Sequence, residues 1–152
     1  MEIQLSDEAR AWQAKACSFA DEELAPWEVE AEMHGGELPA EVRQRHRTQA
    51  YALGFAAMDV PKSHGGLALS TVAQLAVWEQ FGRITNALAW CFSEAQQWMF
   101  EACTEAQLER YILPLMRGTR HECYAITERE SGSEVAISTS ARRCPSERRA
   151  IC

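Results

Sequence analysis

Apolar positions along residues 6–118 recur at spacings of three and four, which predicts about five helices in series. Ser6 can cap the first helix, and Pro26 is expected to end or kink it. A loop at residues 34–39 then leads to a second helix over residues 40–53 that stops near Gly54. The apolar stripe of the first helix consists of Ala9, Trp12, Ala16, Phe19 and Ala20.

The next three helices follow a connection at residues 56–70 that one proline and two glycines mark with sharp turns. Ser70 can cap the third helix, which is expected to end near Gly82. Residues 86–102 are apolar nearly all round, which predicts one buried helix. The apolar positions of the third helix are Val72, Leu75, Ala76 and Trp78.

The last helix has the clearest pattern in the chain. Thr104 and Gln107 have the spacing of a capping box at its start, and Gly118 closes it. Its apolar stripe consists of Leu108, Tyr111, Ile112 and Leu115.

The pattern changes to a β-like one after Gly118. Residues 122–127, ECYAIT, predict a short strand, and residues 134–141 predict a second β-like piece after a small-residue turn. A strand without an adequate partner is not stable by itself, so we interpret this region as the start of a second domain. The predicted organisation is a helical domain at 1–120, a β-domain start at 121–141 and an irregular Arg-rich tail at 142–152.

Charge and composition narrow the possible partners. The net charge is −7, but the tail at 142–152 holds four Arg and one Glu, so the other 141 residues carry 11 basic and 21 acidic side chains, a net of −10. Such an acidic body repels phosphates, which argues against nucleic-acid binding, and the short Arg-rich tail does not reverse this. No apolar run approaches the roughly 20 residues of a membrane span, and the first residues do not resemble a signal peptide.

The cysteines and histidines do not form a recognisable metal or disulfide pattern. Six cysteines include no CxxC pair, and four histidines include no HxxxH or HExxH motif. We therefore expect no metal site, and we expect most thiols to be buried in a reducing compartment, the cytoplasm. Glu94 lies among apolar neighbours and is either a buried acid or, more commonly, a residue on a solvated flank.

The turn after the predicted strand has two possible functions. Gly132 would let a ligand approach the backbone, and the hydroxyls of Thr127 and Ser133 could bind a phosphate. The residues alone favour a plain surface turn, since they match neither a Walker loop nor a GxGxxG motif. Trp90 and Trp98 are likewise either core aromatics or the lining of an apolar pocket.

Four stretches in the right order resemble the N-terminal part of the flavin-dependent acyl-CoA dehydrogenase family, over about residues 4–141. VPKSHGGLALS resembles its Pro-x-x-(Tyr)-Gly-Gly-x-Gly loop, with His64 at the aromatic position and Ala68 where glycine is common. The other three stretches are LSDEARAWQAKACSFADEELAP, TEAQLERYILPLMRGT and YAITERESGSEV. The resemblance implies a mainly α fold: the helical N-terminal domain of that family with the first strands of an incomplete β-domain.

The resemblance also implies FAD as cofactor and an acyl-CoA thioester as substrate. By position it assigns flavin contact to Tyr124, Ala125, Ile126 and Thr127, and a turn near the FAD and CoA phosphates to Gly132 and Ser133. Ser133 and Trp90 would contact the substrate, Trp90 by lining the acyl-chain tunnel. Arg129, Glu130 and Ser131 replace the usual Pro-Gly-Ala of the family's turn.

In the family a glutamate of a C-terminal domain removes the α-proton of the thioester while the flavin accepts a hydride. No glutamate of this chain matches that position, so we assign no catalytic residue and expect a truncated chain that is inactive alone. The complete parent is expected to be a homo-oligomer. Alternatives are a non-catalytic helical interaction module, or an acyl-CoA oxidase or flavin monooxygenase on the same fold.

Overall fold

The computed structural model describes residues 4–122, apart from the side chains of residues 86 and 87, and every regular element in that range is helical. This confirms the predicted helical fold class over those residues. The predicted strand at Tyr124–Thr127 and the β-like piece at 134–141 lie outside the described residues. In chain order, with η marking 3₁₀ or π-helical turns, the elements are α1 (Asp7–Phe19), η1 (Ala20–Leu24), η2 (Ala25–Trp27), α2 (Glu28–Met33), α3 (Ala40–Leu53), η3 (Phe55–Ala57), η4 (Lys62–His64), α4 (Thr71–Phe81), α5 (Asn86–Ala89), α6 (Gln97–Ala102), α7 (Glu105–Gln107), η5 (Leu108–Ile112) and α8 (Leu113–Met116).

Serine caps explain where α1 and α4 begin. The backbone N–H of Ala9 donates to Ser6 Oγ at 3.2 Å, and the N–H of Ala73 donates to Ser70 Oγ at 3.3 Å. Pro26 does not end the first helical run, because it lies in the first turn of η2, where its missing N–H is tolerated. The run therefore continues through η1 and η2 into α2.

The predicted boundaries of the second and the last helix are confirmed. The second helix ends at Gly54, and the capping box of Thr104 and Gln107 is formed at the start of α7. From there α7, η5 and α8 make one continuous helical run that is followed by Gly118 in a left-handed conformation.

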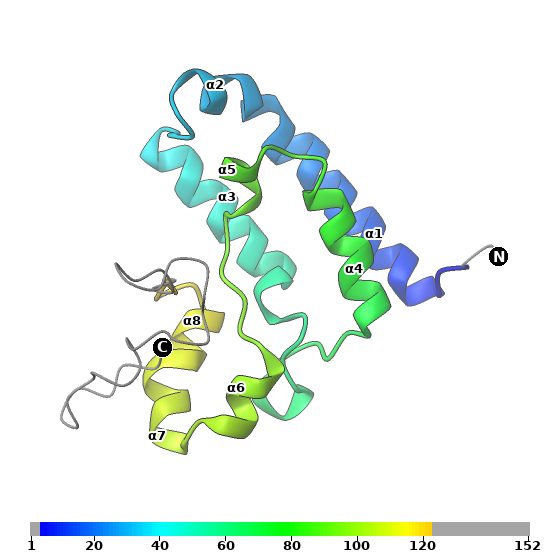
Figure 1. Ribbon diagram of the computed structural model, residues 1–152, viewed down its shortest axis with the longest axis vertical. Helices are drawn as coiled ribbons and strands as arrows, with labels where there is room; N and C mark the ends of the chain where they lie inside the picture. Colours follow the sequence, from blue (N-terminus) through cyan, green and yellow to red (C-terminus); the bar gives the residue numbers. More distant parts are fainter. Residues whose placement is uncertain (1–3, 123–152) are drawn as a thin grey trace, which may run out of the picture. The chain divides into compact units, whose positions relative to one another are not determined.

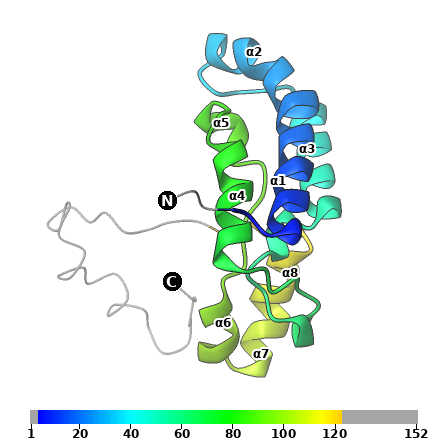
Figure 2. The same cartoon turned by 90° about the vertical axis from the view of Figure 1, so that its right-hand side faces the viewer.

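The largest helix-to-helix contact joins α1 and α4, which lie side by side in both views (Figures 1 and 2). Both helices contribute to what we call the aromatic core, which consists of Phe19, Phe55, Phe81 and Phe92. Phe55 is fully buried, and its ring centroid lies 5.1 to 5.9 Å from those of the other three rings. Such ring pairs contribute dispersion and quadrupole attraction beyond simple apolar burial.

The predicted third helix forms, but its inward face differs from the predicted apolar positions. Val72 and Leu75 are 49% and 62% exposed, and the buried residues of α4 are Ala73, Ala76, Val77, Gln80 and Phe81. Because α4 is apolar on most sides, the sequence period does not determine which face meets α1.

The predicted single helix over residues 86–102 is wrong. The structure has two short helices, α5 and α6, with an extended segment between them at residues 90–96 (Figure 1). Two backbone N–H groups of this segment form hydrogen bonds with residues that are distant in the sequence. The N–H of Ser93 donates to Tyr51 Oη, and that of Ala95 donates to the carbonyl of Ala56, both at 3.3 Å. Tertiary hydrogen bonds thus replace the helical ones that the local sequence favours.

A second, smaller apolar cluster lies beneath α6, η5 and α8. We call it the loop cluster, and its buried residues are Val60, Ala95, Ile112 and Leu115. Met99, Phe100 and Tyr111 pack against it while remaining partly exposed. Within the described residues, no helix has the length and apolar character needed to cross a membrane.

Candidate functional site

The 57–70 loop has a tight hairpin-like backbone. The N–H groups of Leu67 and Ala68 donate to the carbonyls of Ala57 and Val60 at 3.0 and 2.9 Å. Gly66 is required where the two sides approach, since a Cβ there would lie 2.1 Å from the Val60 carbonyl oxygen. The loop that carries the resemblance motif is thus a close-packed structural element.

Ala68 has an unusual backbone in this loop. Its φ is +47°, and no other non-glycine residue in the described range has a positive φ. The left-handed region is unfavourable for a residue with a Cβ. The family pattern has glycine at this position, and glycine adopts a positive φ without steric cost. The backbone conformation at Ala68 therefore explains why glycine suits this position.

Asp59 connects the 57–70 loop to its two neighbouring helices. Its Oδ2 accepts the N–H of Gln97 at 2.9 Å, at the start of α6, and its Oδ1 accepts from Gln74 Nε2 of α4 at 3.2 Å. Phe100 of α6 also stacks on the His64 ring, with centroids 4.8 Å apart. The loop therefore fixes α6 against α4, which sequence reasoning did not foresee.

The aromatic side chains of Phe92, Trp90 and Trp98 take different positions. Phe92 is 7% exposed and belongs to the aromatic core, where its ring stacks on Trp78 with centroids 5.7 Å apart. Trp90 and Trp98 are 66% and 52% exposed. The core alternative therefore does not hold for the two tryptophans, and the tunnel role of Trp90 stays a prediction.

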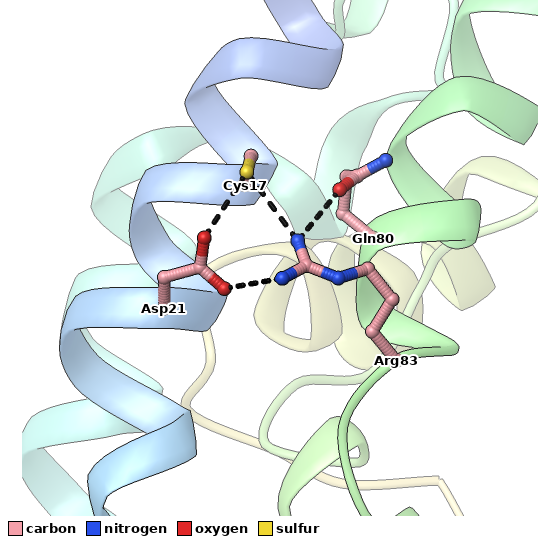
Figure 3. Close-up of polar contacts among 4 residues, drawn as sticks. All are labelled: Cys17, Asp21, Gln80 and Arg83. Atoms are coloured by element: carbon pink, nitrogen blue, oxygen red, sulfur yellow. Dashed lines mark hydrogen bonds and ion pairs between the residues drawn. The ribbon is translucent and has the colours of Figure 1, made fainter.

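A polar cluster joins the end of α4 to the junction of α1 and η1 (Figure 3). Arg83 Nη2 donates to Asp21 Oδ1 at 2.7 Å, and Nη1 donates to Gln80 Oε1 at 2.9 Å and Cys17 Sγ at 3.4 Å. The Cys17 thiol in turn donates to Asp21 Oδ2 at 3.2 Å. The bonds to Cys17 and Asp21 raise the pKa of the guanidinium, which stays charged and acts as a fixed clamp rather than a proton carrier.

Two buried groups have shifted pKa values. Burial, followed by the charge of Arg45, lowers the pKa of His46, whose Nε2 has no hydrogen-bond partner. Burial raises the pKa of Cys91 to about 12, so this thiol is protonated and unreactive at neutral pH. Among residues 4–122, neither group has the partner that acid–base or nucleophilic catalysis requires.

Two residues of α3 hold the chain where it leaves the helical domain. Arg47 Nη2 donates to the carbonyls of Gly118 at 2.7 Å and Arg120 at 3.3 Å. Gly118 has a φ of +70°, and a Cβ there would lie 2.9 Å from the Tyr51 ring. Sequence reasoning missed Arg47 and Tyr51, because their partners are about 70 residues away and no local pattern connects them.

The six predicted flavin-contacting residues, Tyr124, Ala125, Ile126, Thr127, Gly132 and Ser133, lie outside the described residues. No group of His, Cys, Asp and Glu suited to a metal ion occurs among residues 4–122.

Comparison with known families identifies the class of protein to which this fold belongs. The family model described as acyl-CoA dehydrogenase, N-terminal domain, matches residues 6–119. The chain therefore belongs to the acyl-CoA dehydrogenase family and contains its N-terminal domain.

Two curated relatives are similar over most of this chain. Subunit CarC of the caffeyl-CoA reductase-Etf complex of Acetobacterium woodii is 27% identical over 131 residues, which are 83% of this chain and 34% of the relative. The 3-(aryl)acrylate reductase of Clostridium sporogenes is 26% identical over 132 residues, 84% of this chain and 34% of the relative. The chain thus spans about a third of the length of the curated relatives it matches.

Solved structures share the same fold. An acyl-CoA dehydrogenase complexed with FAD from Bacillus anthracis matches with a TM-score of 0.69 and 23% identity, over 90% of this chain and 23% of that one. The butyryl-CoA dehydrogenase of Megasphaera elsdenii matches with a TM-score of 0.66 and 21% identity, over 90% of this chain and 36% of that one. At these identities the likeness defines the fold of the helical domain.

Proposed function

We propose that the chain is the N-terminal part of an FAD-dependent, acyl-CoA dehydrogenase-like oxidoreductase that acts on the Cα–Cβ bond of an acyl-CoA thioester. The observation that carries this is the family match over residues 6–119, followed in the sequence by YAITERESGSEV. That segment is where the resemblance assigns flavin contact to Tyr124–Thr127 and a phosphate-binding turn to Gly132 and Ser133. Bound FAD supplies the hydride acceptor for the reaction.

Contacts at the end of the described range support this assignment. Arg47 and Tyr51 hold residues 118–120, only four residues before Tyr124. A binding segment must be held close to its productive geometry to contribute to affinity. The helical domain would therefore act as a rigid base for the start of the flavin site.

Trp90 is proposed to limit the acyl-chain tunnel. Its exposed ring follows α5 directly and is not part of the aromatic core, which leaves it accessible to a substrate. The curated relatives carry the names of caffeyl-CoA and arylacrylate reductases, and the solved ones those of acyl-CoA and butyryl-CoA dehydrogenases. We therefore leave the direction of the reaction and the acyl group open between these classes.

A chain-length series tests the role of Trp90 in a parent enzyme that carries the family's other domains. Relative kcat/KM for long over short acyl-CoA substrates should rise in Trp90→Ala. Trp98→Ala, a similarly exposed tryptophan on α6, is the matched control and should leave that ratio unchanged. An unchanged ratio in Trp90→Ala would exclude Trp90 from the tunnel.

These 152 residues alone are proposed to be inactive and to bind FAD weakly. The family's catalytic glutamate has no counterpart here, and a general base contributes roughly 10²–10⁴-fold in rate. Purified chain, FAD, an acyl-CoA and an artificial electron acceptor should give no flavin bleaching. Turnover would contradict inactivity while leaving the family assignment intact. A cytoplasmic location and a homo-oligomeric parent stay predictions.

The alternatives are distinguished by simple observations. A non-catalytic interaction module would remain colourless when the complete parent is purified, whereas a flavoenzyme would be yellow. An acyl-CoA oxidase or flavin monooxygenase would consume oxygen at the rate of substrate turnover, whereas a dehydrogenase would need another electron acceptor.

A further inference from the structure

One end of the helical domain has an unbalanced negative charge. Residues 16–42 contain eight Asp and Glu and no Lys or Arg. Arginine side chains from elsewhere in the described range pair with Asp21, Glu23 and Glu37, and His34, which belongs to the stretch itself, lies 3.5 Å from Glu30. Within residues 4–122, the acidic residues of this stretch that form no ion pair are Glu22, Glu28, Glu32 and Glu41.

Two of these carboxylates border an apolar surface on α2. Val29 and Met33 are each 76% exposed, the largest exposure among the large apolar residues of the described range. Being four residues apart, they lie next to each other on one side of the helix. Together with Glu28, Glu32 and Thr85 they line a shallow hollow of about 330 Å³, which we call the α2 hollow. Figure 2 shows α2 beside α5, at the far end of α1 from its N-terminus.

Thr85 holds both carboxylates of the α2 hollow in place. Its N–H donates to Glu28 Oε1 at 2.8 Å, and its hydroxyl donates to Glu32 Oε1 at 2.7 Å. Two like charges four residues apart on a helix repel each other, and no described cation relieves this repulsion. The carboxylates are therefore pre-positioned for a cation, and each has a second oxygen with which to accept a hydrogen bond.

We propose that the α2 hollow is a docking site for a basic, amphipathic segment of another protein. An aliphatic side chain of the segment would pack on Val29 and Met33, and flanking Lys or Arg side chains would pair with Glu28 and Glu32. The pairing of an apolar centre with a charged rim is typical of protein interfaces.

Charge argues against an anionic membrane, a nucleic acid and a second copy of the chain docked through the same face. An anionic membrane or a nucleic acid would be repelled by the eight acidic side chains of residues 16–42. A second copy of the chain, docked through the same face about a two-fold axis, would bring Glu28 and Glu32 against their own counterparts. A basic partner is the occupant that relieves the charge and covers the apolar pair.

Selection from a random peptide library displayed on phage tests the proposal with the full chain as bait. Counter-selection uses a variant that carries Glu28→Gln, Glu32→Gln and Met33→Gln together. Gln keeps an oxygen that can accept the hydrogen bonds of Thr85, so the fold is retained, and circular dichroism verifies this. Enriched peptides should combine Lys or Arg with Leu, Ile or Met. Enrichment of peptides without basic residues, or none beyond the counter-selected background, would overturn the proposal.

One enriched peptide is then synthesised, and its Kd for variants of the chain shows where it binds. Kd should weaken about two- to thirtyfold in Glu28→Gln/Glu32→Gln, the loss expected for two partly exposed ion pairs. Met33→Gln should weaken binding as well. Matched controls are Leu75→Gln, at another exposed apolar residue, and Glu105→Gln/Glu109→Gln, another exposed acidic pair four residues apart. Equal losses in the controls would show nonspecific attraction and refute the α2 hollow as the site.

Discussion

The aromatic core and the loop cluster show two different ways of burying apolar surface. The core packs rings that contact one another, three from helical elements and one, Phe92, from the segment between α5 and α6; Phe55 and Phe81, for example, have centroids 5.1 Å apart. The loop cluster gathers only four buried residues, and two of them, Val60 and Ala95, come from irregular backbone rather than from a helix. The core therefore depends on side-chain volume, and the loop cluster depends on how the surrounding backbone is held.

Removal of a core ring should have the largest effect on stability. In Phe55→Ala we expect a loss of about 3–5 kcal/mol in the free energy of unfolding, because a fully buried side chain leaves a cavity amid packed rings. Urea denaturation followed by circular dichroism measures it. Leu75→Ala, at a residue that is 62% exposed, should change stability by less than about 0.5 kcal/mol. Similar losses in both variants would contradict the position of the core.

A substitution at a glycine should disrupt the loop cluster without removing any of its side chains. In Gly66→Ala the new Cβ would lie 2.1 Å from the Val60 carbonyl oxygen, so the 57–70 loop must shift. We expect a loss of about 3 kcal/mol, at the upper end for overpacking, because the obstacle is backbone. Gly65→Ala meets no atom within 4 Å and has only an unfavourable φ of +81° to tolerate, so it should cost about 1 kcal/mol. Equal losses would mean that close packing at Gly66 does not hold the loop.

Protonation of His46, a buried residue of α3, should make the free energy of unfolding depend on pH. Because burial lowers the pKa of His46 below its ordinary value of 6.5, the unfolded chain binds a proton more readily than the folded one. The Arg45 charge adds to this effect, and Glu23 opposes it. Stability should be complete above about pH 6.5 and fall below it, by at most about 1.4 kcal/mol per pH unit.

Urea midpoints between about pH 7.5 and about pH 5.5 test this contribution in wild type and in His46→Leu. The variant is expected to lose stability less steeply with acid, because its side chain cannot take up a proton. Parallel pH profiles for the two proteins would show that His46 is not the group responsible.

The difference between the two clusters also explains what the sequence could predict. Local chemistry determines the caps at Ser6, Ser70 and Thr104, so these helix starts were predicted correctly. Residues 86–102 carry no proline or glycine, and the bonds that break the predicted helix come from Tyr51, Ala56 and Asp59. Interactions at such separations leave no trace in a local pattern.

The candidate site shows the same limit. The 57–70 loop could be recognised from its motif, but Asp59, which caps α6, and Arg47, which holds Gly118, could not. Each acts on a residue at least 38 positions away, so only the folded chain shows its role. The flavin assignment at Tyr124–Thr127 rests on resemblance and stays a prediction.

The smallest predicted effect concerns Ala68, where the chain departs from the family's glycine. A φ of +47° costs an L-residue about 1–2 kcal/mol, because its Cβ crowds the following carbonyl. Glycine removes that strain but loses about 0.5–1 kcal/mol more backbone entropy on folding. Ala68→Gly should therefore raise the free energy of unfolding by up to about 1.5 kcal/mol, measured by urea denaturation. Leu67→Gly, at the preceding position where φ is negative, gains no relief from strain and should be destabilising. Destabilisation of both variants alike would show that Ala68 is not strained, and the hairpin would then owe its shape to Gly66 and its hydrogen bonds alone.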